Sequence, residues 1–441
     1  MGRRKKDTWD IGQVDSLRQA MFDQAREEFG AGAVYTGTEA EQRIVGLPIP
    51  ALCLRYLFQS AVFPLGRFID IVGKQGSGKS AMLYELFRWH YYYGGYSFLV
   101  ETESKDSPDL RNAIVGDSDA VASIMADSLE GWMGTLLKCI RIAQGAFDGT
   151  PANPGPGRIR PVCFGIDSLT AVAAEETRAN INKNGAPSRR YPIEAMKITD
   201  MFRVLPAEIR DFPFTLAGIN HLKDAQSEDP RAAKRLPGGL GLRFQATYEL
   251  EMAFVGDIRL KSYQGIEVTL CLRKNSMGPS RRKIGASLIW WDEPDEAGVM
   301  RQRVLWNWNA ATIELLLAFH KDKWMQDAIQ NIVDLHVVNM KGKKVWSNCL
   351  GISRDDPVSF YEAGEKIEAR DDVCAELHKL FGIRNRATFK PGMDYRVQLD
   401  EAQKQLVPAL DSNGEIIEAT AGVPWSHAAS LRDEFDAGGE V

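Results

Sequence analysis

Residues 73–80 constrain the fold of this chain more than any other segment. They match the pattern G-x-x-x-x-G-K-[ST] at every fixed position, directly after the β-branched run Phe68–Val72. A helix is predicted to begin at Lys79 and to end near Tyr92. In that context the glycines let backbone N–H groups curl around phosphates, and the helix N-terminus adds positive potential. The predicted phosphate-binding residues are Gly73, Lys74, Gln75, Gly76, Ser77, Gly78, Lys79 and Ser80.

Two side chains of this loop and one beyond it have specific predicted roles. Lys79 is expected to reach the β- and γ-phosphates of a nucleotide, and the Ser80 hydroxyl is expected to hold Mg²⁺. Such a loop also needs a carboxylate on the metal side, at the end of another strand. Asp167 supplies it, because it ends the apolar run Cys163–Ile166.

Hydrolysis of a nucleotide also needs a group that orients water. The predicted strand Tyr96–Val100 runs into Glu101 and Glu103, which places two carboxylates near a strand tip. Because they are two residues apart, they share a face if the strand continues, and Glu103 reaches further past the tip. Without the phosphate loop, both would be read as surface charges.

The segments around the loop alternate between predicted strands and helices, and this pattern favours a parallel sheet covered on both faces. Beyond about Leu305 the pattern changes to helices and a basic turn, which predicts a second, smaller domain. Further predicted strands are 123–126, 161–166 and 214–219; further predicted helices are 193–209, one near 367–380, and one whose inner face carries Trp132, Leu136, Leu137, Ile140 and Ala143.

The N-terminal part of the chain predicts a helix over residues 10–29. Its apolar stripe consists of Val14, Leu17, Met21 and Ala25. This stripe is too small to form a domain of its own, so the helix is expected to dock on the body or on a neighbouring subunit.

The composition is that of a globular chain, with 44% hydrophobic and 26% charged residues. No apolar run approaches the roughly 18 residues of a membrane span. From Asp400 onward there are nine acidic and two basic residues, a local charge of −7 that leaves the rest at +2 within a total of −5. An acidic tail of this kind either masks a polyanion-binding surface or keeps the chain in solution.

Cysteine and histidine give no sign of a metal site. The six cysteines lie far apart without a Cys-x-x-Cys pair, which predicts reduced core thiols of a cytosolic protein. The six histidines are scattered, and none has the spacing of metal ligands.

Six ordered blocks over roughly residues 10–300 resemble segments of the RecA-like recombinases, and of the phage-type members in particular. This resemblance implies an α/β fold with a RecA-type P-loop ATPase core, a parallel-dominated twisted sheet, a short N-terminal helical segment and a smaller C-terminal α/β domain. It places an N-terminal oligomerisation segment at 1–45, the ATPase core at 46–305, the C-terminal domain at 306–399 and the acidic tail at 400–441. The blocks are Phe29–Val34, Phe63–Arg67, Val100–Glu103, Ile166–Leu169, Ile219–His221 and Pro237–Phe244.

The resemblance also implies roles for single residues. It assigns the catalytic carboxylate to Glu103 and the sensing of the γ-phosphate to His221, where cellular members usually have Gln and phage members resemble this chain. Lys274 matches one of two cations that reach into a neighbour's ATP site, and Ser276 stands at the other position. Arg273 or Arg281 are candidates for the missing cation. Leu110 falls near the place of a Tyr that covers the adenine.

Two long polar stretches, 177–192 and 222–236, are predicted to be loops that bind DNA phosphates. Tyr191 in the first stretch either stacks on a base or packs in a turn. The candidate DNA-binding cations are Arg178, Lys183, Arg189, Arg190, Lys223, Arg231, Lys234, Arg235 and, at the close of the second stretch, Arg243. A second basic patch, expected to capture duplex DNA, comprises Lys341, Lys343, Lys344, Trp346, Lys379, Arg384, Arg386 and Lys390.

Taken together, the resemblance implies an ATP- and Mg²⁺-dependent enzyme that forms filaments on single-stranded DNA and pairs it with homologous duplex DNA. It implies a cytoplasmic protein, in the host cytoplasm if a phage encodes it. Single-strand-binding or loader proteins remain open as further partners. Two rivals also remain open: a hexameric helicase with the same core, and a protein that coats single strands and binds ATP without turnover.

Overall fold

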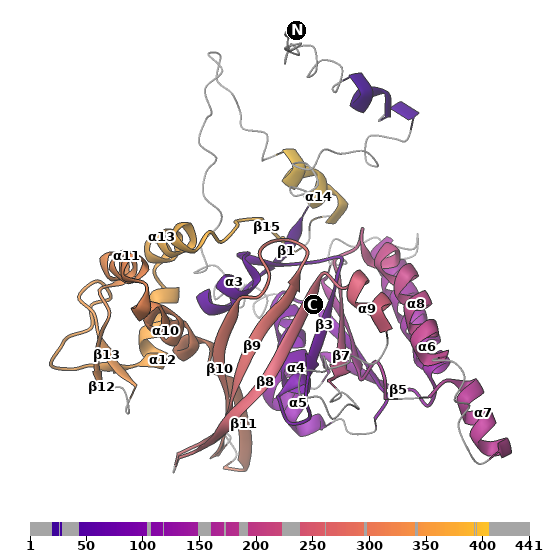
Figure 1. Cartoon of the computed structure of the whole chain (residues 1–441), viewed down its shortest axis with the longest axis horizontal. Coiled ribbons are helices and arrows are strands. Elements are labelled where there is room, and N and C mark those ends of the chain that lie inside the picture. The colour runs from indigo at the N-terminus through magenta and orange to yellow at the C-terminus, as the bar shows by residue number, and fades with distance from the viewer. Residues whose placement is uncertain are drawn as a thin grey trace, which may run out of the picture. The chain divides into compact units, whose positions relative to one another are not determined.

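Figure 1 shows the computed structural model of the chain, coloured from the N-terminus to the C-terminus. It describes residues 20–25, 27–28, 44–103, 107–117, 119–148, 160–171, 173–184, 193–222, 239–260, 262–294, 298–339, 343–391, 393 and 395–404. Of the predicted helix 10–29, residues 20–25 and 27–28 are described and are helical. The acidic tail lies outside the described residues after Lys404. The elements from Val45 to Gln398 belong to one compact unit.

The centre of this unit is a mixed sheet with the strand order β11-β10-β9-β8-β3-β7-β6-β4-β5 among the described residues. The strands from β8 to β5 in this order are parallel, and β8 to β11 are antiparallel. The predicted α/β class with a parallel-dominated sheet is confirmed. The strands are β3 (Arg67–Gly73), β4 (Tyr96–Glu101), β5 (Val121–Met125), β6 (Val162–Asp167), β7 (Phe214–His221), β8 (Tyr248–Arg259), β9 (Gln264–Asn275), β10 (Lys283–Pro294) and β11 (Met300–Trp306).

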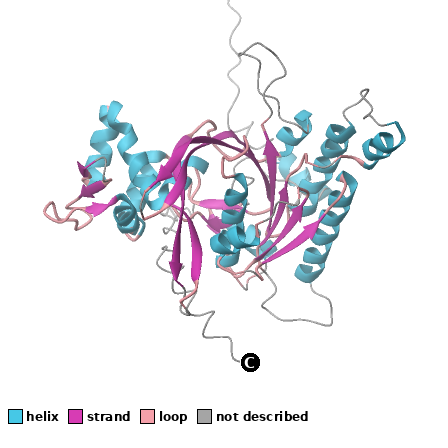
Figure 2. Cartoon of the chain, turned by 90° about the horizontal axis from the view of Figure 1, so that it is seen from below, coloured by secondary structure: helices cyan, strands magenta, loops and turns pink. Residues whose placement is uncertain are grey.

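Helices cover both faces of this sheet (Figure 2). In β3, Ile69 and Ile71 face one core with helices α4 and α5, while Phe68 faces a second core with α6, α8 and α9. Each large apolar side chain buried in these cores contributes roughly 1.5–3 kcal/mol to folding, which explains why apolar side chains dominate β3, β6 and β7. The helices are α4 (Lys79–Tyr92), α5 (Pro108–Val115), α6 (Leu129–Asp148), α8 (Ile193–Ile209) and α9 (Gly239–Gln245).

The C-terminal part has its own apolar core, which includes Ile329, Val345, Phe360 and Leu377. Helices and a small antiparallel sheet surround it, as expected for a smaller α/β domain. The predicted helix near 367–380 begins only at Asp371, because α12 ends before it. The elements are α10 (Trp308–Ala318), the 3-10 turn η2 (Phe319–Lys321), α11 (Lys323–Val333), β12 (His336–Asn339), β13 (Lys344–Trp346), β14 (Val358–Ser359), α12 (Phe360–Glu368) and α13 (Asp371–Phe381).

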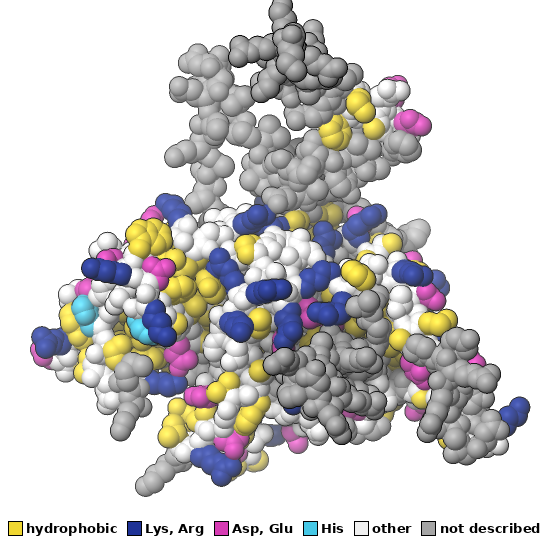
Figure 3. All heavy atoms as spheres, in the orientation of Figure 1, with side chains coloured by type: hydrophobic (Ala, Val, Ile, Leu, Met, Phe, Trp, Pro, Cys, Tyr) yellow, Lys and Arg dark blue, Asp and Glu magenta, His cyan; other side chains and the backbone are white. Residues whose placement is uncertain are grey.

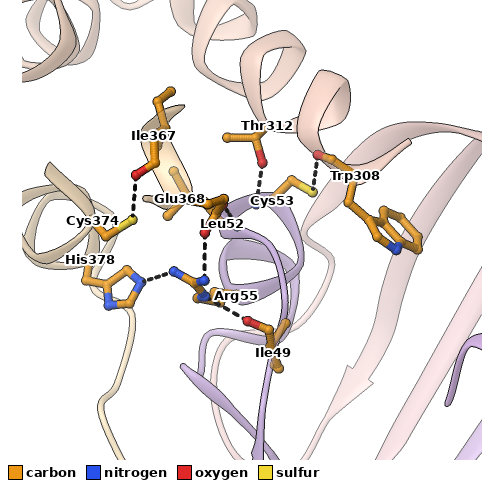
Figure 4. Close-up of polar contacts among 10 residues, drawn as sticks. All are labelled: Ile49, Leu52, Cys53, Arg55, Trp308, Thr312, Ile367, Glu368, Cys374 and His378. Carbon is orange, nitrogen blue, oxygen red and sulfur yellow. Dashed lines mark hydrogen bonds and ion pairs between the residues drawn. The ribbon is translucent and has the colours of Figure 1, made fainter. Parts of the chain in front are cut away.

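A buried arginine joins this domain to the core of the chain (Figure 4). Arg55 is fully buried on α3 and donates to Glu368 Oε2 at 2.7 Å, to the Ile49 carbonyl at 2.9 Å and to His378 Nε2 at 3.3 Å. The other oxygen of Glu368 accepts the backbone N–H of Leu52 at 2.6 Å, at the start of α3. Because Arg55 donates to its Nε2, the ring of His378 is neutral, and burial lowers its pKa to about 4. The remaining elements are β1 (Val45–Pro48), α3 (Leu52–Phe58), β2 (Val62–Pro64), β15 (Ala387–Thr388) and α14 (Tyr395–Lys404).

The first predicted DNA loop, 177–192, is wrong as a loop over residues 177–184. Helix α7 (Glu175–Asn184) occupies them, and residues 185–192 lie outside the described residues. Glu175 and Glu176 lie in its first turn and Lys183 in its last turn, and these charges complement the helix dipole. The helix has almost no apolar residues, so its periodicity is not visible in the sequence.

The thiols are only partly in the core. Four cysteines are buried, but Cys271 is half-buried and Cys349 is exposed, so the prediction of six core thiols is wrong for these two. Among the described residues, no helix combines the length and the apolar character needed to cross a membrane.

Candidate active site

The phosphate loop lies where β3 ends and α4 begins, at the carboxyl end of the central parallel strands. Gly76 and Gly78 have φ angles of +77° and +80°, a left-handed conformation that glycine adopts without strain. The Nζ of Lys79 donates to the Lys74 carbonyl at 2.8 Å, and the Ser77 hydroxyl donates to the same carbonyl at 2.9 Å. The loop is thus closed on itself by its own lysine and serine.

The predicted metal side is assembled in the structure. The Ser80 hydroxyl donates to Asp167 Oδ2 at 2.7 Å, although the two residues are 87 positions apart. Burial raises the pKa of Asp167, and Glu103 adds to the rise, while the bond from Ser80 and the charges of His221 and Lys79 oppose it. A hydroxyl and a carboxylate side by side are the oxygen ligands that Mg²⁺ takes beside a bound phosphate. The residues at this position therefore fit the ion.

Glu103 lies past the tip of β4 and is held by two partners from neighbouring strands. His221 Nε2 lies 3.0 Å from Glu103 Oε1, and the Ser168 hydroxyl donates to the same oxygen at 2.7 Å. Glu101 is buried at the tip of β4 itself. Of the two carboxylates that the sequence left open, Glu103 is the one beside His221.

The charges of this site meet at Lys79. Burial lowers the pKa of its ammonium, whereas Asp167 and then Glu103 raise it. Lys79 is only 6% exposed, and two carboxylates act on its ammonium group. These carboxylates favour the charged ammonium at the point where the loop would surround phosphate oxygens.

The loop is also bonded directly to the segment that follows β7. The backbone N–H of Leu222 donates to the Gly73 carbonyl at 3.1 Å, and His221 pairs with Gly73 in the β3–β7 register. Leu222 is the first residue of the second predicted DNA stretch. The phosphate loop, His221 and the first residue of this stretch therefore meet at the carboxyl end of the parallel strands.

Other predicted site residues lie away from the phosphate loop. The Lys274 Nζ donates to the carbonyls of Arg243 and Phe244 at 2.7 and 2.8 Å, at the end of α9. Arg243 binds Glu249 through two hydrogen bonds, and Arg273 pairs with Glu251.

The remaining predictions have mixed placements. Leu110 is on α5 and packs against the core, and Arg281 is exposed with a φ of +69°. Arg178 and Lys183 are exposed on α7, where Arg178 donates to the Asp127 carbonyl at 2.7 Å. Outside the described residues lie Arg189, Arg190, Tyr191, Lys223, Arg231, Lys234 and Arg235.

The predicted basic patch of the C-terminal domain has several internal partners. Lys343 donates to Glu314 at 2.7 Å, Lys379 to Glu376 at 2.7 Å, and Arg386 to the Met277 carbonyl at 3.1 Å. Trp346 stacks on His336 with ring centroids 4.0 Å apart. Lys341 lies outside the described residues.

Two residues of the site were missed by sequence reasoning. Ser168 holds Glu103, and the Thr102 hydroxyl bridges the backbone N–H and carbonyl of Ser168 at 2.8 and 2.9 Å. The signal was their position, since each is adjacent to a predicted carboxylate at a strand tip. Among the described residues, no group of three or more His, Cys, Asp or Glu side chains is arranged to hold a metal ion.

Comparisons with known proteins find sequence similarity to RecA proteins. The RecA protein of Streptococcus uberis is 25% identical over 292 residues, which cover 63% of this chain and 71% of that protein. The RecA protein of Streptococcus gordonii is 23% identical over 311 residues, covering 68% and 76%. The chain is similar to RecA. The RecA protein of Lactobacillus johnsonii is 25% identical over 255 residues, covering 57% of this chain and 65% of its own length. No family model matches the chain. The sheet with its P-loop is a RecA-type core.

Proposed function

We propose that this chain is an ATP-dependent recombinase that forms filaments on single-stranded DNA and exchanges strands with a homologous duplex. The observation that carries the proposal is the grouping of Lys79 with two hydrogen-bonded pairs, Ser80–Asp167 and Glu103–His221, at the carboxyl end of the parallel strands. This group lies next to the start of a basic segment. The similarity to RecA supports it. His221 in place of Gln favours the phage-type members, and the domain limits 1–45, 46–305, 306–399 and 400–441 are kept as part of the proposal.

Each residue of the site has a defined task in this proposal. Bound Mg²⁺ supplies charge neutralisation for the phosphates. The loop N–H groups and Lys79 bind the phosphates, while Ser80 and Asp167 hold the ion side of the site. Glu103, fixed by Ser168 and His221, accepts a hydrogen bond from the attacking water and orients it. Gly73 to Ser80 close around the triphosphate.

His221 is proposed to report the state of the nucleotide to the DNA side. In the structure its Nε2 faces Glu103, while its backbone ends β7 one residue before Leu222. A γ-phosphate is an alternative acceptor for the same ring, so its arrival draws His221 away from Glu103. That exchange of partners shifts the start of the second basic stretch. In nucleotide switches of this type, the γ-phosphate orders a segment and its loss releases that segment.

A basic surface lies near α9. Figure 3 shows Lys and Arg side chains gathered over the region of β8, β9 and β10. Exposed members on the described strands and turns include Arg273, Arg281 and Lys283. Phosphate contacts made by such cations provide affinity without sequence preference, as strand exchange between any homologous DNA requires. The proposed DNA contacts otherwise remain those of the two basic stretches.

Lys274 is proposed to act on a neighbouring subunit. Its register partner is Glu249, near the start of β8, and Glu249 in turn pairs with Asp70 in the middle of β3, so Lys274 lies on the amino side of the phosphate loop. The phosphate loop of the same chain lies at the carboxyl ends. A cation on that side serves a nucleotide site only when subunits stack head to tail.

The test is ATP turnover with and without single-stranded DNA, together with an image of the protein on DNA with ATP. DNA-stimulated turnover and open helical filaments are the expected results. Closed rings that unwind duplex DNA would replace the proposal with a helicase, and binding without turnover would replace it with a coating protein.

A further inference from the structure

A buried acidic pair lies under helix α9, in the middle of the sheet. Asp70 of β3 and Glu249 of β8 are direct partners in the parallel register, so their side chains lie on the same face. Asp70 is 0% exposed and Glu249 is 1% exposed. Two ionised carboxylates on one buried face of a sheet repel each other, and this repulsion together with burial favours a proton on one of them.

Arg243 is the counter-charge of this pair. Its Nε donates to Glu249 Oε2 at 2.7 Å and its Nη2 to Oε1 at 3.0 Å, a planar two-point pairing that Arg makes and Lys does not. Arg243 lies on α9, the helix that leads into β8. The pairing therefore ties α9 to the strand beside the phosphate loop.

The other charged groups around the pair already have partners. Glu251 pairs with Arg273, and Lys274 donates to the last carbonyls of α9. On the β7 side the neighbour is the Asn220 amide, which favours the ionised form of Asp70 without supplying a charge. Among the described residues, Arg243 is the cation hydrogen-bonded to this buried acid pair, and the charge of Lys274, the register partner of Glu249 in β9, also acts on it.

We propose that Asp70 and Glu249 form a one-proton acid pair that holds Arg243, and with it α9, against the P-loop strand. Asp70 carries the proton and Glu249 the charge. Arg243 is then a positioning residue of the core and not a contact for DNA phosphates, although it closes a basic stretch. The claim about DNA contact by Arg243 rests on the proposed function. The claims about the proton on Asp70 and the position of α9 do not.

The pKa of Asp70 is raised, as a protonated Asp70 requires. Burial, and next the charge of Glu249, raise the pKa of Asp70 from 3.8 to about 8. An acid whose pKa is raised on folding holds a proton in the folded chain at pH values where the unfolded chain has lost it. This site therefore lowers stability as the pH rises from about 4 to about 8, and its contribution is constant above that range.

The first experiment needs no DNA. The melting temperature is measured from about pH 5 to pH 8.5 for the wild type, Asp70→Asn and the control Asp257→Asn, an exposed acid of β8 paired with Arg259. Asparagine mimics the protonated acid, so Asp70→Asn should lose part of the fall in melting temperature and exceed the wild type by several degrees at pH 8.5. The control should keep the wild-type profile. If Asp70→Asn also keeps the wild-type pH profile, Asp70 does not hold a proton in the folded chain and the proposal fails. If Asp70→Asn does not fold, Asp70 is needed as a carboxylate and the proposal fails as well.

The second experiment asks whether Arg243 serves the pair or DNA. Arg243→Gln, Glu249→Gln and the double variant are compared in melting and in the salt dependence of single-strand binding. The positioning role predicts that both single variants lower the melting temperature, that the double variant recovers part of the loss, and that the salt slope is unchanged. Arg243→Lys, which keeps the charge, should also lose stability. A DNA contact instead lowers the salt slope by about 0.7 in both Arg243→Gln and the double variant, and that result overturns the assignment. If the wild type does not bind single strands, the proposed function fails while the melting cycle still decides the acid pair.

Discussion

Lys79 is the residue on which the nucleotide site depends most directly. We expect Lys79→Ala to weaken ATP binding by one to two orders of magnitude, since a hydrogen bond to a charged group contributes about 1.5–3 kcal/mol. It should also abolish nucleotide-stimulated DNA binding. Equilibrium ATP binding and turnover measure this, with Lys138→Ala, an exposed lysine of α6, as the control. Normal turnover in Lys79→Ala would refute the phosphate-loop assignment.

Glu103 is expected to orient the attacking water and not to contribute to the affinity for ATP. Glu103→Gln keeps the shape and the contacts to Ser168 and His221 but removes the charge, so hydrolysis should fall by about 10²- to 10⁴-fold while ATP stays bound. Complexes on DNA should then live longer. Single-turnover hydrolysis and DNA dissociation rates test this. Unchanged hydrolysis would move the role to Glu101.

Ser168 offers a graded version of the same test. Ser168→Ala removes the hydroxyl that holds Glu103 but leaves the carboxylate and its partner His221. We expect a smaller decrease in hydrolysis than in Glu103→Gln, with ATP affinity unchanged. A decrease equal to that of Glu103→Gln would show that orientation by Ser168 is required for all of the activity of Glu103.

Single residues were predictable where a side chain lies at a strand tip. Asp167 and His221 each end a mostly apolar strand, and parallel strands bring such tips together. Lys79 was predictable instead from the G-x-x-x-x-G-K-[ST] motif at the start of α4. The hydrogen bond from Ser168 to Glu103 was not predictable, because it depends on β4 and β6 being neighbours in the sheet. The engagement of Arg243 by Glu249 depends likewise on α9 lying over β8.

At the scale of elements, α3 and α12 are joined through Arg55 and Glu368. Glu368→Ala leaves a fully buried guanidinium without its carboxylate, and breaking such a pair costs about 3–5 kcal/mol. Urea unfolding should show this loss. Glu376→Ala, which removes an exposed pair with Lys379, should cost less than about 1 kcal/mol. Equal losses would mean that the Arg55 pair is no stronger than a surface contact.

The elements that the sequence predicted well are those with strong periodicity. Helices 79–92 and 193–209 agree with α4 and α8 as the structure describes them, because each buries a recurring set of apolar side chains. The antiparallel strands β8 to β11 were not predicted individually. The signal was present in β9, where buried Val268, Leu270 and Leu272 alternate with more exposed residues, but the strands are long and rich in charge at their exposed far ends.

At the scale of the whole molecule, the acidic tail is expected to compete with duplex DNA. Deleting the chain from Asp411 should tighten duplex binding more than single-strand binding, because the tail carries most of the negative charge and the body is slightly positive. The gain should be largest at low salt, since charges are screened beyond about 8–10 Å at physiological ionic strength. A salt titration of duplex affinity for both proteins tests this. Equal affinities at low salt would make the tail a solubilising segment.

The position of Lys274 has a consequence for any assembly of this chain. In the proposed head-to-tail stack, each Lys274 would complete the nucleotide site of the next subunit. The stack then has two chemically different ends: one exposes a nucleotide site without a donated lysine, and the other exposes a lysine without a site. On this proposal, subunits would join and leave the two ends at different rates, and Lys274 would contribute to the direction in which the polymer grows.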